Sequence, residues 1–301
     1  WAERYDRELV DIFDLQDELT EAISAVVNTE LAGSERDLAR KKSSADLDAW
    51  DYYQRGMWHL YKMSKEEVVE ARQLFEIATE RAPSFPSPHA ALGYVAAIEA
   101  LSGYTQDREA TLEAGLLDAQ RAVTLDERDG FSQFALGRVC IVLGERDRAM
   151  LALEKSIELN PNSAPAYYGL GVAHYWVGRP EKAAPLLDRA IRLSPTDPQL
   201  WTFHYIRGNA RYFMGDAEAA IADQKAAIQN KGDEYLPYLS LACAFALHGY
   251  RDNEARAALD NASRLKPGLS ETFLRETVGN LHPPYLENFF HCLKKLGLPE
   301  D

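Results

Sequence analysis

The stretch LGVAHYWVGRPEKA, from Leu170 to Ala183, decides the fold. It places Tyr175 and Trp176 directly before a Gly-Arg-Pro turn, with a small residue at Gly171. Two such aromatic residues suit a packed core, a cofactor site or a binding surface, so the stretch alone does not assign them. The decisive question is whether the stretch recurs in the neighbouring sequence.

A period of 34 residues runs through this part of the chain, from 130 to 163 and again from 164 to 197. Eight positions match between the two copies without a gap. The matching pairs are Leu136 and Leu170, Gly137 and Gly171, Gly144 and Gly178, Ala149 and Ala183, Leu153 and Leu187, Ser156 and Ala190, Leu159 and Leu193, and Pro161 and Pro195. Eight matches at the same positions of two successive 34-residue copies indicate an internal structural repeat.

Looser copies flank these two and bring the number of predicted units to six. The units cover residues 49–85, 86–129, 130–163, 164–197, 198–234 and 235–269. The second unit is stretched by about ten residues around 102–109 relative to the usual period. The sequence leaves open whether this unit holds a long helix pair or an ordered loop.

Each unit has the pattern of two helices joined by a short turn. Two apolar-periodic segments of roughly 13 residues predict the helices. A glycine at position 15 ends the first helix, and a proline at position 32 ends the second. Small residues at positions 8, 20 and 27 let the two helices approach closely. One such hairpin cannot bury its own apolar face, so neighbouring hairpins must stack, which predicts an all-α solenoid.

The pattern resembles the tetratricopeptide repeat over residues 49–269. The resemblance implies a right-handed superhelical solenoid of stacked antiparallel helix pairs that binds other proteins. The aromatic residue usual at position 4 is present as Tyr52, Tyr167 and Tyr238, and is replaced by His89, Gln133 or His204 in the other units.

The two ends of the chain depart from the repeat. Within residues 1–48, the segment from Asp11 to Val27 predicts an amphipathic helix. Its apolar face consists of Ile12, Leu15, Leu19, Ile23, Val26 and Val27. At the other end, residues 270–301 predict a capping helix, which a solenoid needs in order to cover its last exposed face. Its apolar residues are Leu286, Phe289, Phe290, Leu293 and Leu296, and it is expected to close at Gly297 and Pro299.

The ends also carry a second resemblance. The stretches WAERYDRELVDIFDLQDEL (1–19), DAWDYYQRG (48–56) and KKLGLPED (294–301) resemble the C-terminal half of bacterial signalling proteins. In those proteins a class III adenylate or guanylate cyclase domain, or a winged-helix DNA-binding domain, leads through a TolB-like segment into repeats of this kind. Residues 1–48 would then be the tail of the TolB-like segment. Because the chain begins with Trp rather than Met, we expect it to be a piece of a longer protein.

Composition excludes several classes of function. The 301 residues carry a net charge of −14, so an acidic surface would repel nucleic-acid phosphates, and no nucleic-acid partner is expected. Three widely spaced cysteines do not form a disulfide framework and suit a cytoplasmic protein. The longest apolar run, around residues 238–247, is too short to span a bilayer, so no membrane insertion is expected.

Catalytic patterns are absent from the sequence. The seven histidines form no HExxH motif and no metal-ligand spacing with cysteines. His174 falls at a packing position of its unit, where a core histidine is the simpler interpretation. Phosphate-binding glycine loops are also missing. We therefore expect no enzyme activity, no metal and no cofactor in this chain.

The first helices of the units are expected to line the concave side of the solenoid through positions 2, 5, 9, 12 and 13. Read from the sequence, the predicted groove residues are Trp50, Tyr53, Met57, Tyr61, Tyr94, Phe131, Phe134, Arg138, Tyr168, Tyr175, Trp176, Tyr205, Asn209, Tyr212 and Phe213. An apolar patch of this extent on a monomer usually serves binding. The alternative is that these rings pack among neighbouring helices.

The predicted groove suits an apolar partner. Related domains that grip a terminal carboxylate use Lys, Asn and Arg at several groove positions, whereas here only Arg138 and Asn209 are polar at position 9. We expect an apolar helix or extended segment, with tyrosine hydroxyls bound to its backbone. The 11–27 helix is one candidate partner within the chain, although it could equally pack on the first repeat alone. Two functions follow as hypotheses: an interaction scaffold in a bacterial signalling protein, or a regulatory domain that controls a cyclase in the same polypeptide.

Overall fold

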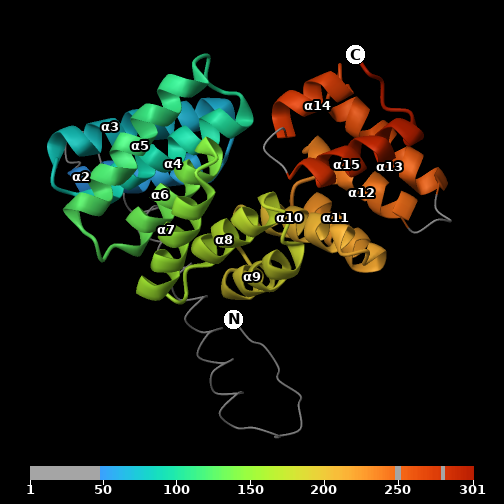
Figure 1. Ribbon diagram of the computed structural model, residues 1–301. Coiled ribbons are helices and arrows are strands. Elements are labelled where there is room, and N and C mark those ends of the chain that lie inside the picture. Colours follow the sequence, from blue (N-terminus) through green and yellow to red (C-terminus); the bar gives the residue numbers. More distant parts are fainter. Residues whose placement is uncertain (1–47, 248–251, 279–281) are drawn as a thin grey trace, which may run out of the picture.

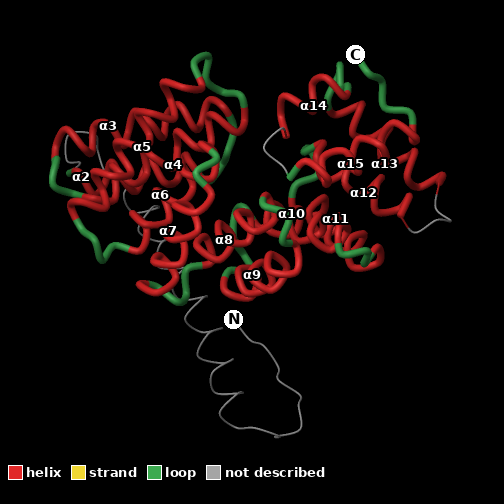
Figure 2. The backbone as a smooth tube through the Cα atoms, in the orientation of Figure 1, coloured by secondary structure: helices red, strands yellow, loops and turns green. Residues whose placement is uncertain are grey.

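The computed structural model describes residues 48–247, 252–278 and 282–301 (Figure 1). Throughout these ranges the regular structure is helical, and no strand is present in them (Figure 2). The predicted helix at 11–27 lies outside the described residues.

Twelve of the helices form six consecutive pairs, and each pair packs along its length. The pairs are α2 (Ala49–Leu60) with α3 (Lys65–Arg81), α4 (Pro86–Ser102) with α5 (Arg108–Leu125), α6 (Gly130–Leu143) with α7 (Arg146–Leu159), α8 (Ala164–Trp176) with α9 (Pro180–Leu193), α10 (Leu200–Phe213) with α11 (Ala217–Asn230), and α12 (Tyr235–Leu247) with α13 (Asp252–Leu265). Each pair also packs against the next, so the prediction of an all-α solenoid is confirmed.

In three units the glycine at repeat position 15 follows the first helix in the left-handed region. Gly144, Gly178 and Gly215 have φ values of 81°, 77° and 82°. A side chain at such a φ is strained, so glycine at repeat position 15 allows the tight turn into the second helix.

Glycine at repeat position 8 serves a different purpose, the close approach of paired helices. A Cβ at Gly137 would lie 2.5 Å from Leu153 Cγ, and a Cβ at Gly171 would lie 2.8 Å from Leu187 Cγ. The leucine at position 24 therefore fills the space that a side chain at position 8 would need.

The stretched second unit is a long helix pair. Helices α4 and α5 contain 17 and 18 residues, and a short turn at Gly103 joins them. The added length builds an extra apolar cluster in which Leu112 packs with Val139 and Val142 of α6. Of the two interpretations that the sequence left open, the structure thus selects the longer helices.

The solenoid curves around a central opening. Helices α2–α7 stand on one side, α12–α15 stand on the other, and α8–α11 connect them (Figure 1). Apart from the cluster around Leu112, the buried apolar residues form one large cluster that reaches from Met57 to Ala210 and a second from Ala220 to Leu298. The boundary between the clusters falls between α10 and α11.

Two helices follow the sixth pair. Besides the expected last helix, α15 (Pro283–Leu296), the structure contains α14 (Glu271–Val278), which the sequence pattern did not predict. The last helix ends at Gly297, with φ 108°, and buries Phe290 and Leu293 against α12 and α13. The tail beyond it returns to α14, where the Glu271 N–H donates to Pro299 O at 2.9 Å.

Candidate functional site: a tyrosine-lined cavity on the concave side

A cavity of about 250 Å³ lies on the inner side of the curve. Its walls come from α4, α6, α8, α10 and α12, with α15 at one edge. The lining side chains are Met63, Tyr94, Ile98, Leu101, Ser102, Arg138, Tyr168, Tyr175, Trp176, Gln199, Trp201, Thr202, Tyr205, Ile206, Asn209, Tyr212, Phe213, Leu236, Ser240, Cys243 and Phe289. Tyrosine and tryptophan dominate this surface, as is usual for sites where one ligand face is apolar and the other polar.

The structure brings nine of the fifteen predicted groove residues to this cavity. They are Tyr94, Arg138, Tyr168, Tyr175, Trp176, Tyr205, Asn209, Tyr212 and Phe213. All of them lie on α4, α6, α8 and α10, the first helices of the second to fifth units.

The other six predicted residues lie away from the cavity. Trp50, 44% exposed, packs with Tyr53 and Phe85 at ring distances of 5.6 and 5.9 Å. Met57 and Phe134 are buried in the core. The remaining two, Tyr61 and Phe131, are half-buried against the same core cluster.

The lining rings differ in exposure. Tyr94, Tyr168 and Tyr175 are only 6%, 9% and 5% exposed, so they form the floor of the cavity. Trp176 and Tyr205 are half-buried and form its rim.

Two closures restrict the cavity. On one side Gln199, at the start of α10, accepts a hydrogen bond from the Tyr94 hydroxyl at 3.1 Å and donates to Met63 Sδ at 3.5 Å. On the other side the Tyr285 ring of α15 stacks on Phe213 at 4.0 Å. Its hydroxyl donates to Gly178 O at 3.2 Å, which ties α15 to the turn between α8 and α9.

Several residues that line the cavity were not predicted from the sequence. Gln199 and Met63 lie in connections between helices, and Phe289 lies on the last helix, so the repeat positions do not identify them. Trp201 is different, because it precedes Tyr205 by four residues on α10 and so shares its helix face. That spacing was a usable signal.

The tyrosine hydroxyls at the cavity are neutral donors. Burial raises the pKa of Tyr94 to about 12, although the Arg138 charge and the hydrogen bond to Gln199 oppose the rise. Burial also raises the pKa of Tyr175 and Tyr205, against the effect of hydrogen bonds to Asn209. These hydroxyls therefore keep their protons at neutral pH.

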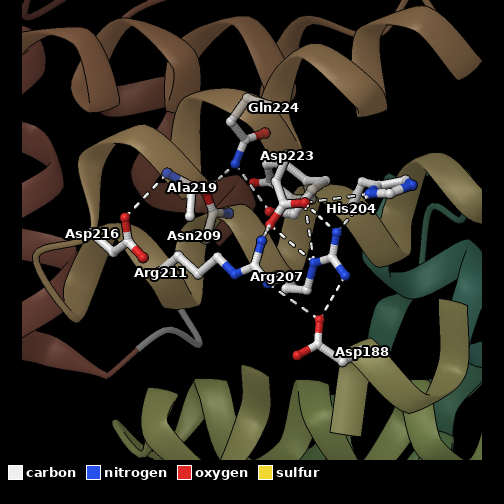
Figure 3. A network of polar contacts seen from close by, with 10 residues as sticks. Asp188, His204, Arg207, Asn209, Arg211, Asp216, Ala219, Asp223 and Gln224 are labelled. Atoms are coloured by element: carbon white, nitrogen blue, oxygen red, sulfur yellow. Dashed lines mark hydrogen bonds and ion pairs between the residues drawn. The ribbon is translucent and has the colours of Figure 1, made fainter. Parts of the chain in front are cut away.

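A polar network behind α10 holds this wall in place (Figure 3). Asp223 of α11 accepts from Arg207 Nε at 3.0 Å and from Arg211 Nη1 at 2.9 Å. Arg207 Nη1 also donates to Asp188 of α9 at 2.6 Å. The carboxylates of two neighbouring second helices thus fix one face of α10, while its other face lines the cavity.

Gln224 extends the network to the cavity itself. Its amide nitrogen donates to Asn209 Oδ1 at 3.0 Å and to Tyr205 O at 3.1 Å (Figure 3). Because Asn209 Oδ1 is engaged in this way, its NH₂ group remains for the tyrosine hydroxyls of the cavity.

The possible metal ligands and nucleophiles among the described residues do not gather into a second site. Within the described ranges, no three His, Cys, Asp or Glu side chains gather in a way that could hold a metal ion. His174 is buried, and burial lowers its pKa. Burial raises the pKa of the Cys140 thiol to about 12, so this cysteine is an unreactive core residue. No helix in the part of the chain that the structure describes has the length and apolar character needed to cross a bilayer.

Sequence comparison identifies the repeat. Residues 136–204 match the family model of the tetratricopeptide repeat. A protein named "Putative adenylate cyclase 3", from Rhizobium meliloti (strain 1021), is 28% identical over 136 residues, which are 45% of this chain. The match spans only 23% of that relative's length.

Structural comparison finds the same architecture in solved proteins. The APC/C hetero-tetramer Cut9–Hcn1 aligns with 85% of this chain and 45% of its own, with a TM-score of 0.63 and 16% identity. The pilF protein of Pseudomonas aeruginosa aligns with 77% of this chain and 94% of its own, with a TM-score of 0.53 and 19% identity. A thermophilic TPR protein of Thermus thermophilus aligns with 66% of this chain and 99% of its own, with a TM-score of 0.52 and 19% identity. At these identities the likeness concerns the fold.

Proposed function

We propose that this chain is an interaction scaffold of the tetratricopeptide-repeat kind, without enzyme activity of its own, and that it binds a polypeptide partner at the tyrosine-lined cavity. The single observation that carries this proposal is the cavity itself. Its rings come from the first helices of the second, fourth and fifth units and from α15, and its rim includes two half-buried tryptophans, Trp176 and Trp201. Tryptophan and tyrosine at such positions are the residue types that dominate binding energy at interfaces.

The size of the cavity favours an extended partner over a helical one. A helix with its side chains is about 10–12 Å wide, which a space of about 250 Å³ does not enclose. An extended segment instead directs alternate side chains to one side. One or two apolar side chains would enter the cavity, while the partner backbone lies across Trp176 and Trp201.

The test uses the rim tryptophans. Extended peptides selected by display against the parent chain supply ligands, and their affinities are then measured for the double variant Trp176→Ala/Trp201→Ala. We expect affinity to fall at least about tenfold, as for anchor residues of interfaces. Trp58→Ala is the matched control, because Trp58 is a half-buried tryptophan of α2 outside the cavity. Unchanged affinity in the folded double variant would reject the cavity as the partner site.

An internal partner is one form of this proposal. The segment at 11–27 is tethered to the solenoid, so its effective concentration is high. A photoreactive residue in place of Leu19 would attach to α8 or α10 if the segment occupies the cavity. Attachment to α2 or α3 instead would assign the segment to the first repeat.

A second candidate function is regulation of a class III adenylate cyclase in the same polypeptide. The match to the Rhizobium meliloti protein favours it, together with the resemblance of the chain ends to bacterial signalling proteins. On this proposal the repeats act in the bacterial cytoplasm, where the cyclase substrate is made. The reading frame that contains this chain would then encode a cyclase domain, and cyclase activity would change in the Trp176→Ala/Trp201→Ala variant of the whole protein. A reading frame without such a domain would remove this candidate.

A further inference from the structure

One charged side chain lines the cavity, that of Arg138 on α6. It is 5% exposed, and its Nε and Nη1 atoms are buried without a hydrogen-bond partner in the described part of the chain. Its guanidinium lies over the Tyr168 ring, 5.4 Å from the ring centre. Ring contact of this kind stabilises the cation but accepts no hydrogen bond along the N–H directions.

A buried guanidinium without an acceptor is costly. Arginine does not lose its proton in proteins, so the charge cannot be removed by titration. Burial of an unpaired charge is strongly unfavourable, whereas a carboxylate partner in the right geometry compensates for much of it. Although the chain contains 47 acidic residues, none of the lining residues is acidic. The cavity therefore has a positive centre that its own described walls do not neutralise.

The remaining polar groups around the cavity fit the same ligand. The hydroxyls of Tyr175 and Tyr205 are held near Asn209, and the buried Ser240 hydroxyl lies beside Tyr205. Hydroxyl and amide groups can donate to an anion, and the rest of the lining is apolar or aromatic. The cavity therefore combines a group of hydrogen-bond donors with an otherwise apolar lining.

We propose that the cavity is a binding site for a carboxylate carried on a small apolar or aromatic body, with Arg138 as the partner of the carboxylate. This inference rests on the proposed role of the cavity as the binding site and names the chemistry of what enters it. At about 250 Å³, the space is just below the usual range for small-ligand pockets, about 300–1,000 Å³. A body of one aromatic ring with a short acidic arm is the appropriate size. Such a group has two sources, a free small acid or a Glu or Asp side chain of the bound segment.

The first experiment separates charge from shape. Calorimetry would compare 3-phenylpropionate with 3-phenylpropionamide, which differ mainly in the charged group, on the whole chain. We expect the acid to bind at least about ten- to a hundredfold more tightly, since hydrogen bonds to a charged group are the stronger kind. Arg138→Gln should remove this preference. Arg148→Gln is the matched control, because it deletes the same charge at a site with 40% side-chain exposure on α7.

The second experiment separates the two sources. Peptides blocked at both ends, acetyl-Leu-Glu-Phe-amide and acetyl-Leu-Gln-Phe-amide, carry or lack one side-chain carboxylate. Preference for the glutamate peptide assigns the site to a partner segment, whereas preference confined to the small acid assigns it to a metabolite. Both results support the carboxylate site. No preference for either charged probe, or a preference that persists in Arg138→Gln, overturns it.

The melting temperature of Arg138→Gln is measured together with its ligand affinity, to show that the variant is folded. Because Arg138 is buried without an acceptor, Arg138→Gln should melt at or above the temperature of the parent chain, and the acid should raise the melting temperature of the parent alone. The proposal that a polypeptide partner binds at the cavity can be rejected independently of the carboxylate site. If the charged probe binds through Arg138 while Trp176→Ala/Trp201→Ala leaves peptide affinity unchanged, the carboxylate site stands without the partner site.

Discussion

The aromatic residues of the first helices differ between regions of this molecule in how far they are buried. In the third unit, Phe134 of α6 is 2% exposed and packs against Phe131 and Tyr94 at 6.0 and 5.1 Å. On α8 and α10, by contrast, Trp176 and Tyr205 remain half-buried at the rim of a cavity. Residues at the same kind of repeat position thus become core in one region and binding surface in the other.

The difference teaches that a repeat position does not by itself fix exposure. The long helices of the second unit bring α4 against α6, and this contact buries the rings between them. Helices α8 and α10 contact each other less extensively than α4 and α6 do. These two helices line the cavity together with α4, α6 and α12.

The largest expected effect on stability comes from truncating the buried ring of Phe134 on α6. Phe134→Ala removes a fully packed ring from a core that includes Tyr94, so we expect the free energy of unfolding to fall by about 3–5 kcal/mol. Urea unfolding followed by far-ultraviolet circular dichroism measures this. Trp176→Ala should cost less than Phe134→Ala, since part of the Trp176 surface is already in water. Equal losses for the two variants would break the distinction between the regions.

A smaller loss is expected behind the cavity wall. Asp223, with a 3% exposed side chain, binds Arg207 and Arg211, and Asp223→Asn leaves both cations with only the partly exposed Asp188. Breaking a buried pair costs about 3–5 kcal/mol, and the partial exposure of the arginines should reduce this to about 2–3 kcal/mol. Asp188→Asn, at a more exposed carboxylate, should cost less in the same urea titration.

The Asp223 carboxylate also predicts a pH dependence. Burial acts to raise its pKa, but hydrogen bonds from His204 and Arg207 hold it below its ordinary value of 3.8. The unfolded chain therefore binds the proton first as pH falls. Stability from this group is complete above about 3.8 and is lost as pH falls through the lower pKa of the folded state. Unfolding free energies measured from pH 5 downward should fall more steeply in the parent than in Asp223→Asn, and parallel curves would contradict the assignment.

The sequence predicts much of the fold because the repeat rests on local rules. Gly144 and Gly178 end helices through φ values that other residues avoid, and Gly137 marks a close approach to Leu153. These signals lie within one unit and need no knowledge of its neighbours. The number of units, the all-helical class and the first helix faces follow from them.

The site was predicted less completely, because it depends on how units meet. Gln199 reaches Tyr94 across 105 residues of sequence, and Tyr285 of the last helix stacks on Phe213. Neither contact has a sequence signature at its repeat position. Burial of Phe134 likewise depends on its contact with Tyr94 in the preceding unit.

The smallest effect on stability, and the sharpest test of the cavity wall, is expected at Gln224. This residue occupies the repeat position of Leu153 and Leu187, yet it is 1% exposed and its amide nitrogen holds Asn209. Gln224→Leu restores the apolar residue of the other units while leaving Asn209 Oδ1 without its donor. The gain in apolar packing and the loss of a buried hydrogen bond nearly offset, so we expect stability to change by less than about 1 kcal/mol.

Binding should respond more than stability to the same substitution. Without Gln224, Asn209 is free to turn its oxygen toward the cavity, where it would face a bound carboxylate, so affinity for 3-phenylpropionate should fall several-fold. If Gln224 acts through Asn209, the double variant Gln224→Leu/Asn209→Ala should bind no worse than Asn209→Ala alone, because the two losses share one cause. Additive losses would show that Gln224 supports the wall by another route. Full affinity in Gln224→Leu would mean that this polar residue in the core is unrelated to the cavity, and the two regions of the solenoid would then differ in packing alone.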